Sequence, residues 1–324
     1  MAIHRFALTV ALILSCLPTH GQDAEPYRTP IVFQRFSNSE ANPTVPGFYG
    51  GAEIWIMESD GSRLQQFRSD PERHLDHPSL TDNLLHVVYA EFDPGGKTPR
   101  DKARLMIESI GLNAAGKSTR RTLRDVAGCT VHHAALSPTT EELTYSRYCN
   151  DGASALISEM NYALRDAAKI VAADGLRAAN GVATRNTVVF QAEGVPEGGS
   201  RRSSIASIHW DEDGNHTLHM LTQRNHLHRR PAVSPDGQWV AWQSNDSSSG
   251  TDDILLARMD GTQRTRVTHS PANDGHPWFS RDGRTLVFES DRTGNWEIFT
   301  IALDGSDVRQ ITDDPAFVST RPRF

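Results

Sequence analysis

The chain has 324 residues, and Lys and Arg (33) are outnumbered by Asp and Glu (40), which gives a formal net charge of −7. Length alone allows one or two domains. The acidic balance argues against a general nucleic-acid-binding protein, since such proteins carry basic surfaces. Aromatic residues make up 7% of the chain, an ordinary share for a globular protein.

The first 22 residues are predicted to be a secretory signal. One early arginine precedes an apolar run from Phe6 to Leu14, which is too short to span a bilayer as a helix. Two cleavage sites remain open. The sequence Ile-Leu-Ser-Cys resembles a lipobox and would make Cys16 a lipidated N-terminus, whereas conventional cleavage would follow Gly21. We therefore expect a periplasmic or secreted protein that touches a membrane, if at all, through a lipid anchor.

After the signal, an apolar β-run, an Asp-Gly-type turn and a second short strand recur six times, about fifty residues apart. The anchors at equivalent places are Ile54, Leu105, Leu156, Ile205, Ile254 and Ile298. A fixed period of this size indicates repeat architecture. One unit cannot bury both of its faces alone, so the units must stack on one another.

Each unit is predicted to contain four strands. The last complete unit shows them at 275–280, 285–290, 296–302 and 308–312. Asp-Gly between alternating apolar runs is the strongest short-range hairpin signal, because those turns need a positive φ. The sequence therefore predicts an all-β fold of four-stranded antiparallel blades.

Both ends of the repeat region carry an orphan strand. The chain stops at 320–324, an innermost strand with nothing after it, while PIVFQRFS at 30–37 closely matches TLVFESDR at 285–292. The N-terminal strand is expected to complete the last blade and close a ring, which removes open sheet edges. We expect a six-bladed β-propeller over 27–324.

The segments RRPAVSPDGQWVAWQSN (229–245) and GHPWFSRDGRTLVFESDRTGNWEIFTIALDGSDVRQIT (275–312) resemble the repeats of the TolB-like β-propeller family. The match is strong over about 225–324, clear at 53–92 and degenerate at 103–200. It covers the propeller only, without the additional N-terminal domain of TolB. The resemblance implies a monomeric envelope protein with a protein partner or a small ligand at the channel mouth.

Two cysteines remain after the signal, and they flank a predicted hairpin. Cys129 and Cys149 lie symmetrically about Thr139, which places them nearly opposite each other in an antiparallel pair. Export makes a disulfide chemically reasonable. The alternative is two separate buried thiols.

Two local motifs are predicted to be turns. GLNAAGKS (111–118) matches the phosphate-loop pattern, but it falls where a blade needs the turn between its third and fourth strands, so no nucleotide is expected. DEDGN (211–215) has calcium-like carboxylates at a hairpin turn, and a surface turn is favoured. The sequence has no GxSxG, HExxH or CxxC motif.

Aligning the innermost strands places one polar residue at the same position in every blade. These candidate ligand-binding residues, called the ring residues below, are His77, His133, Asn180, Arg230, His276 and Arg321. Innermost strands line the central channel, so the ring suits an anion such as a carboxylate. His77, His133 and His276 could instead hold a divalent metal. A third reading is a hydrated channel whose polar groups bond loops and water.

Further charged and histidine residues lie close to the ring residues in the sequence. Asp76, His132 and Arg229 precede ring residues by one position, and His226 and His228 add a second histidine pair near the same mouth.

The leading expectation is an exported, non-catalytic binding or scaffold propeller of the cell envelope, with no cofactor. The alternative is an enzyme resembling the polyuronide lyases, in which a metal and basic groups neutralise a uronate. Both rest on fold-level analogy.

Overall fold

The computed structural model describes residues 29–37, 51–93, 102–111, 118–140, 142–150, 154–159, 168–171, 177–194, 202–246 and 250–324. The predicted signal and Cys16 lie outside these residues. In the part described, no helix is long and apolar enough to cross a membrane.

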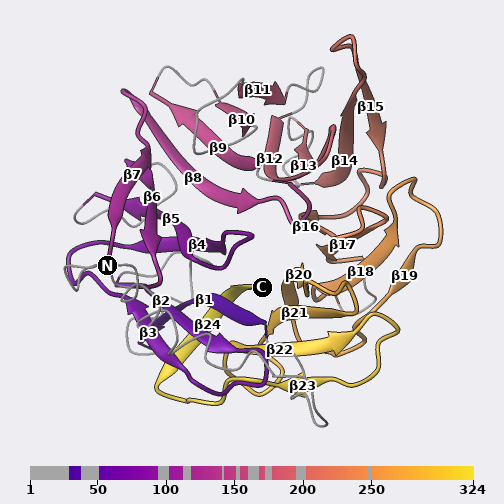
Figure 1. The fold of residues 1–324 in the computed structure, drawn as a ribbon. Helices are drawn as coiled ribbons and strands as arrows, with labels where there is room; N and C mark the ends of the chain where they lie inside the picture. The colour runs from indigo at the N-terminus through magenta and orange to yellow at the C-terminus, as the bar shows by residue number, and fades with distance from the viewer. Residues whose placement is uncertain are drawn as a thin grey trace, which may run out of the picture.

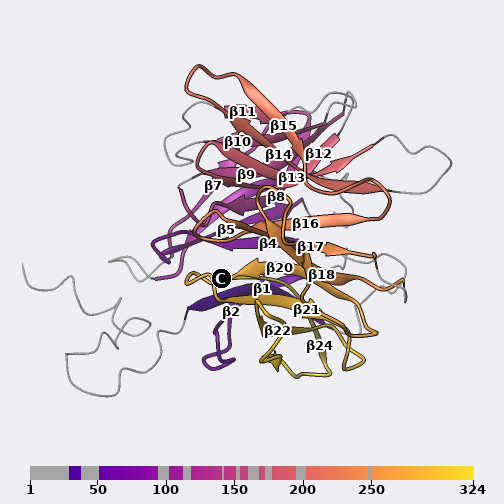
Figure 2. The ribbon, with the colours of Figure 1, turned by 90° about the vertical axis from the view of Figure 1, so that its right-hand side faces the viewer.

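Six four-stranded antiparallel sheets are arranged around one axis, and the C-terminus lies near the centre (Figure 1). Figure 2 shows the same ring from the side. The first blade contains β4 (Leu75–Leu80), β5 (His86–Phe92), β6 (Ala103–Ser109) and β7 (Arg120–Arg124). The second contains β8 (Cys129–Leu136), β9 (Leu143–Cys149), β10 (Ser154–Glu159) and β11 (Ala168–Val171). The third contains β12 (Arg177–Thr184), β13 (Thr187–Glu193), β14 (Ser203–Trp210) and β15 (His216–Met220).

The remaining blades follow the same plan. The fourth contains β16 (His228–Val233), β17 (Trp239–Ser244), β18 (Asp253–Arg258) and β19 (Thr265–Arg266). The fifth contains β20 (Asp274–Phe279), β21 (Thr285–Ser290), β22 (Glu297–Ala302) and β23 (Arg309–Gln310). The sixth joins both ends of the chain in the order β24 (Phe317–Arg323), β1 (Pro30–Ser37), β2 (Glu53–Glu58) and β3 (Gln65–Arg68).

The sixth blade confirms the predicted closure. β1 lies between β24 and β2, and it pairs antiparallel with both. Ile31, Val32, Phe33 and Phe36 on β1 are buried. The strand therefore contributes to the ring as a full second strand, and no inner edge of this blade is left open.

The repeat anchors lie in the third strand of each blade, and all six are fully buried. They pack between neighbouring sheets, as stacking of incomplete units requires. Six blades with one apolar anchor each explain the spacing of about fifty residues in the sequence.

Every innermost strand breaks its ladder at the same place. In all six blades the pairing register shifts across the ring residue and the residue after it, which is a β-bulge. One aromatic residue of the second strand faces each bulge; these are Phe33, Tyr89, Tyr145, Phe190, Trp242 and Phe288, all buried. The aromatic side chain fills the space beside the kinked strand.

The bulge also explains a proline pattern. All six ring residues have a positive φ, between 47° and 55°, a conformation that costs a non-glycine residue about 1–3 kcal/mol. The next residue makes no ladder pair, so a proline there removes no hydrogen bond. Proline accordingly follows the ring residue in four of the six blades.

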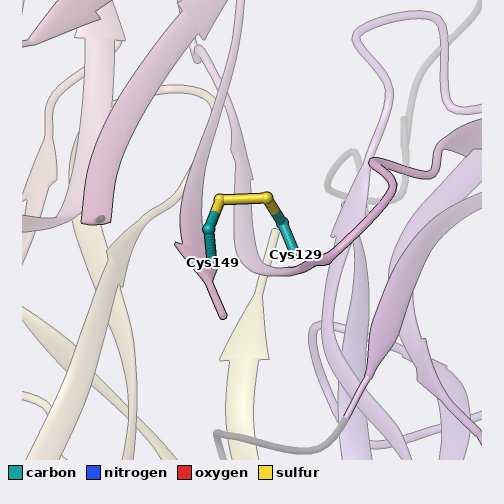
Figure 3. The surroundings of a disulfide bond; sticks show 2 residues. All are labelled: Cys129 and Cys149. Atoms are coloured by element: carbon teal, nitrogen blue, oxygen red, sulfur yellow. A yellow bond between two sulfur atoms is a disulfide. The ribbon is translucent and has the colours of Figure 1, made fainter. Parts of the chain in front are cut away.

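The predicted disulfide is present. Cys129 and Cys149 are directly opposite in the β8–β9 ladder, with Cα atoms 3.9 Å apart, and their sulfurs are bonded (Figure 3). The alternative of two separate thiols is wrong. The bond ties the two inner strands of the second blade together.

Both turn motifs lie at hairpins. Residues 112–117 of the phosphate-loop match are outside the described residues, but the segment joins β6 to β7, and Ser109 N donates to Thr119 O across its base. A strand follows it, where a phosphate loop needs a helix. The DEDGN segment forms the β14–β15 turn, in which Asp211 accepts bonds from the Asp213 and Asn215 amides.

Candidate functional site at the propeller axis

The six ring residues meet around one small cavity on the axis. Its volume is about 30 Å³, and all six ring residues contribute to its lining, together with Trp278 and Arg323 from the same inner strands. A water molecule needs roughly 10–15 Å³ measured in this way. The cavity therefore has room for about two waters or one small anionic group, and it is too small for a sugar ring.

The three histidines form one contact group. The His77 ring lies 4.3 Å from the His133 ring and 6.3 Å from the His276 ring, measured between centroids. His77 Nδ1 is 2.8 Å from Asp76 Oδ2, and His276 Nδ1 is 2.5 Å from Glu289 Oε1. The hydrogen bond to Glu289 orients the His276 ring, so its Nδ1 carries the proton and its Nε2 is left as an acceptor.

All three ring histidines are neutral at physiological pH. Burial is the main cause that lowers the pKa of His77 and His133 well below the ordinary value, and neighbouring cationic groups add to it. Burial and Arg230 lower the pKa of His276 to about 4, against the opposing effect of Glu289. The ring is therefore less basic than its composition suggests, and its positive charge comes from arginine.

Side chains of the second strands support the ring from the neighbouring blade. Gln243 Oε1 accepts a bond from the His276 amide at 3.5 Å, and Glu289 Oε2 accepts one from the Arg321 amide at 2.7 Å. Burial works to raise the pKa of Glu289, but His276, the Arg321 amide and Arg230 hold it below its usual value. These contacts fix the strained ring backbone across blade boundaries.

Arg321 has its partners inside the protein. Its Nη1 donates to Gln34 Oε1 at 2.9 Å and is ion-paired with Asp76 Oδ1. The Arg321 side chain thus links the sixth blade to the first, where the ring closes. This contact gives Arg321 a structural role at the closure of the ring, while its predicted contact with a ligand stays a prediction.

Arg230 and Arg323 differ from Arg321. Among the described residues, neither guanidinium has a carboxylate oxygen within ion-pair distance. Arg230 Nη1 lies 3.4 Å from His77 Nε2, while Arg323 Nη1 donates to Ala134 O and its guanidinium stacks 4.6 Å from the Trp278 ring centroid. Burial lowers the pKa of Arg230 to about 10 and that of Arg323 to about 9, and Arg230 contributes to the second shift.

Sequence reasoning missed Arg323 and the supporting amides. Arg323 lies two residues after Arg321, and the equivalent residues in the other blades are Ser79, Ala135, Val182, Ala232 and Trp278. Residues two apart on a strand share a face, so aligning the position two residues after the ring residue would have shown Arg323 as the one charged residue there. Gln34, Gln191, Gln243 and Glu289 recur at one place in the second strands, a pattern also visible in the sequence.

The geometry does not support the metal alternative. Within the described ranges, no group of three or more His, Cys, Asp or Glu side chains could hold a metal ion. The Nδ1 atoms of His77 and His276 face carboxylates, and the Arg230 guanidinium lies against His77 Nε2, where a metal would need an open lone pair.

The second histidine pair lies apart from the ring. His228 is buried and accepts a bond from Trp242 Nε1, and His226 Nε2 lies 3.7 Å from Asp246 Oδ1. Neither contributes to the lining of the axial cavity. The pair therefore does not extend the candidate site.

A second cavity, of about 110 Å³, lies farther along the axis. It is lined by turns between first and second strands, including Ser137 and Arg281, and by apolar side chains such as Leu80 and Phe324. Trp278 borders both cavities. Trp278, with Arg323 stacked on its ring, thus lies at the border between the two cavities.

Comparison with known proteins agrees with this architecture. Residues 206–321 match the family model described as the TolB beta propeller domain. An uncharacterized protein of Agrobacterium fabrum is 32% identical over 110 residues, which cover 32% of this chain and 37% of the relative. A protein TolB homolog of Chlorobium luteolum is 29% identical over 150 residues, covering 34% of each chain.

The chain thus matches about a third of the length of these curated relatives. Among solved structures, TolB from Acinetobacter baumannii has a TM-score of 0.66 at 17% identity, with 91% of this chain and 66% of that chain covered. This level of identity shows the fold alone. The repeats, the family model matched over residues 206–321 and the closed six-bladed ring together make the chain similar to the TolB-like β-propellers.

Proposed function

We propose that this chain is an exported, non-catalytic binding or scaffold propeller of the cell envelope, which takes a protein partner or an anionic ligand at the mouth of its channel. The observation that carries this proposal is the convergence of six equivalent polar side chains on one axial cavity. The signal-like N-terminus and the family of the repeats support an envelope location.

A binding role fits the chemistry of the ring better than catalysis does. The polyuronide lyase alternative needs a metal beside a uronate, and the described residues provide no such group. A cavity of about 30 Å³ also leaves no room for a uronate ring. Side chains of neighbouring blades hold the ring residues in place, and a preformed site of this kind suits the binding of a ligand group that enters the channel.

The test combines location and contact. Cell fractionation should place the protein in the envelope or outside the cell. A photo-crosslinking residue at Glu72, exposed in the loop before β4 and so at the end where inner strands begin, should capture a partner in cells. The matched control is Asp304, exposed in a turn on the opposite face.

A partner crosslinked from Glu72 but not from Asp304 supports the proposal. Retention in the cytoplasm, or equal capture from both positions, contradicts it.

A further inference from the structure

The charge around the axial cavity is unbalanced. Three guanidinium groups, those of Arg230, Arg321 and Arg323, face two carboxylates, Asp76 and Glu289. Asp76 is paired with Arg321, and Glu289 is bonded to His276 and to the Arg321 amide. Because the ring histidines are neutral, the described residues leave one positive charge at the cavity without a counter-ion.

The surplus charge belongs to Arg230 and Arg323. Asp252 acts on Arg230 through its charge, but it is paired with Arg229 at 2.6 Å and accepts a bond from Gln243 at 2.9 Å, and among the described residues none of its oxygens lies within ion-pair distance of Arg230. Among the described residues, Arg323 donates only to the Ala134 backbone carbonyl, and its guanidinium is stacked on Trp278. Close like charges are costly without an anion or water between them.

We propose that Arg230 and Arg323 bind the carboxylate group of a small monocarboxylate in the axial cavity. The site deepens the proposed binding function and rests on it for its biological meaning. Each guanidinium has five N–H donors. Arg230 uses one toward His77 and Arg323 uses one toward the Ala134 carbonyl, so both retain donors for carboxylate oxygens. Arg–carboxylate bonds are charge-assisted and stronger than neutral ones.

The cavity restricts the occupant by size. Its volume of about 30 Å³ holds about two water-sized atoms, which corresponds to the two oxygens of one carboxylate. The Pro231, Pro277 and Pro322 rings line the same cavity and add apolar surface without backbone N–H donors. Formate and acetate can place their two oxygens in this volume with their carbon atoms against the proline rings, whereas a dicarboxylate would place a second charge there.

The experiment uses the purified mature protein and follows the arginine Nε and Trp278 Nε1 signals by NMR during titration with sodium formate and then sodium acetate. Sodium chloride at the same ionic strength serves as the comparison. We expect saturable shifts at Arg230, Arg323 and Trp278 with both carboxylates, and a response to chloride at least tenfold weaker. An equal response to chloride would show a general anion cavity and overturn the carboxylate assignment.

Three variants make the test specific. Arg230→Gln and Arg323→Gln should each weaken formate binding at least tenfold. Arg309→Gln is the control, because Arg309 is an exposed arginine paired with Asp307 that does not line the cavity, and this variant should keep the wild-type affinity within about twofold. Loss of binding in the control, or full binding in either ring variant, would overturn the proposal.

A second readout guards against misfolding. Removing either guanidinium relieves the repulsion between the two and removes the one surplus positive charge, so Arg230→Gln and Arg323→Gln should have a thermal midpoint equal to or above that of the wild type. A peptide ending in a free carboxylate tests whether the group comes from a partner; binding of that peptide but not of formate would contradict a free monocarboxylate. Formate binding is measured on isolated protein, so it can fail while the crosslinking test in cells succeeds, and the reverse.

Discussion

Substitution of Phe33 by alanine tests whether β1 is a full member of the ring. Phe33 is completely buried on β1 and faces the bulge of β24. Phe288 holds the equivalent place on β21 of the fifth blade and is also completely buried. The two residues are therefore an internal matched pair, one in the closing blade and one in a blade built from continuous chain.

Removing a buried phenylalanine side chain costs about 3–5 kcal/mol, from lost burial and the cavity that remains. A typical domain has only about 5–15 kcal/mol of stability in total. If β1 closes the ring as the structure shows, Phe33→Ala and Phe288→Ala should lower the free energy of unfolding by similar amounts. At about 2–3 °C per kcal/mol, each thermal midpoint should fall by roughly 6–15 °C.

Denaturant unfolding followed by tryptophan fluorescence measures both variants, with the wild type alongside. A Phe33→Ala cost below about 1 kcal/mol, beside a full cost for Phe288→Ala, would refute the reasoning. It would mean that β1 detaches before the ring unfolds and contributes little to its stability.

Three further predictions concern the disulfide, the phosphate-loop match and the ring histidines. Replacing Cys129 and Cys149 by serine should lower the free energy of unfolding by about 3 kcal/mol, because the bond closes a loop with a sequence separation of 20, and an unchanged denaturation midpoint would count against this. Lys117→Ala should leave the thermal midpoint near that of the wild type, and micromolar ATP affinity lost on that substitution would overturn the assignment as a turn. Burial lowers the pKa of His276 to about 4, so between pH 6.5 and 4 the unfolded chain binds a proton at this histidine and the folded chain does not. The free energy of unfolding should therefore fall by about 3 kcal/mol from this group as the pH falls from 6.5 to about 4. An NMR titration midpoint of His276 above 6 would contradict that assignment.

Features set by the repeat itself could be predicted from sequence. The period of the six anchors, the closure by 30–37 and the facing positions of Cys129 and Cys149 all follow from strand order and register. Those properties depend on the backbone and on local patterns such as Asp-Gly turns. The structure confirms each of them.

Contacts between blades could not be predicted in the same way. The sequence placed Arg230 and Arg321 at equivalent positions, but only Arg321 reaches Asp76 of the next blade. That pairing depends on side-chain conformation and on which carboxylates are already bonded. Charge states escaped prediction for a similar reason, since burial, and not residue type, keeps His77 and His276 neutral.

The positive φ at every ring residue could not be predicted from the sequence repeat either. Proline after the ring position marked something unusual in four blades, but the bulge behind it appears only in the pairing register. Arg323 was missed because the strand alignment considered one position and not the next residue on the same face.

A crystal structure of the mature protein grown or soaked in sodium formate tests the central claim, that the propeller axis is a carboxylate site, most directly. We predict planar density for formate in the axial cavity, with its oxygens about 2.7–3.2 Å from the guanidinium nitrogens of Arg230 and Arg323, and no such density in Arg230→Gln crystals. Water alone in the wild-type cavity, or an Arg230 side chain turned onto a carboxylate of the protein, would contradict the claim.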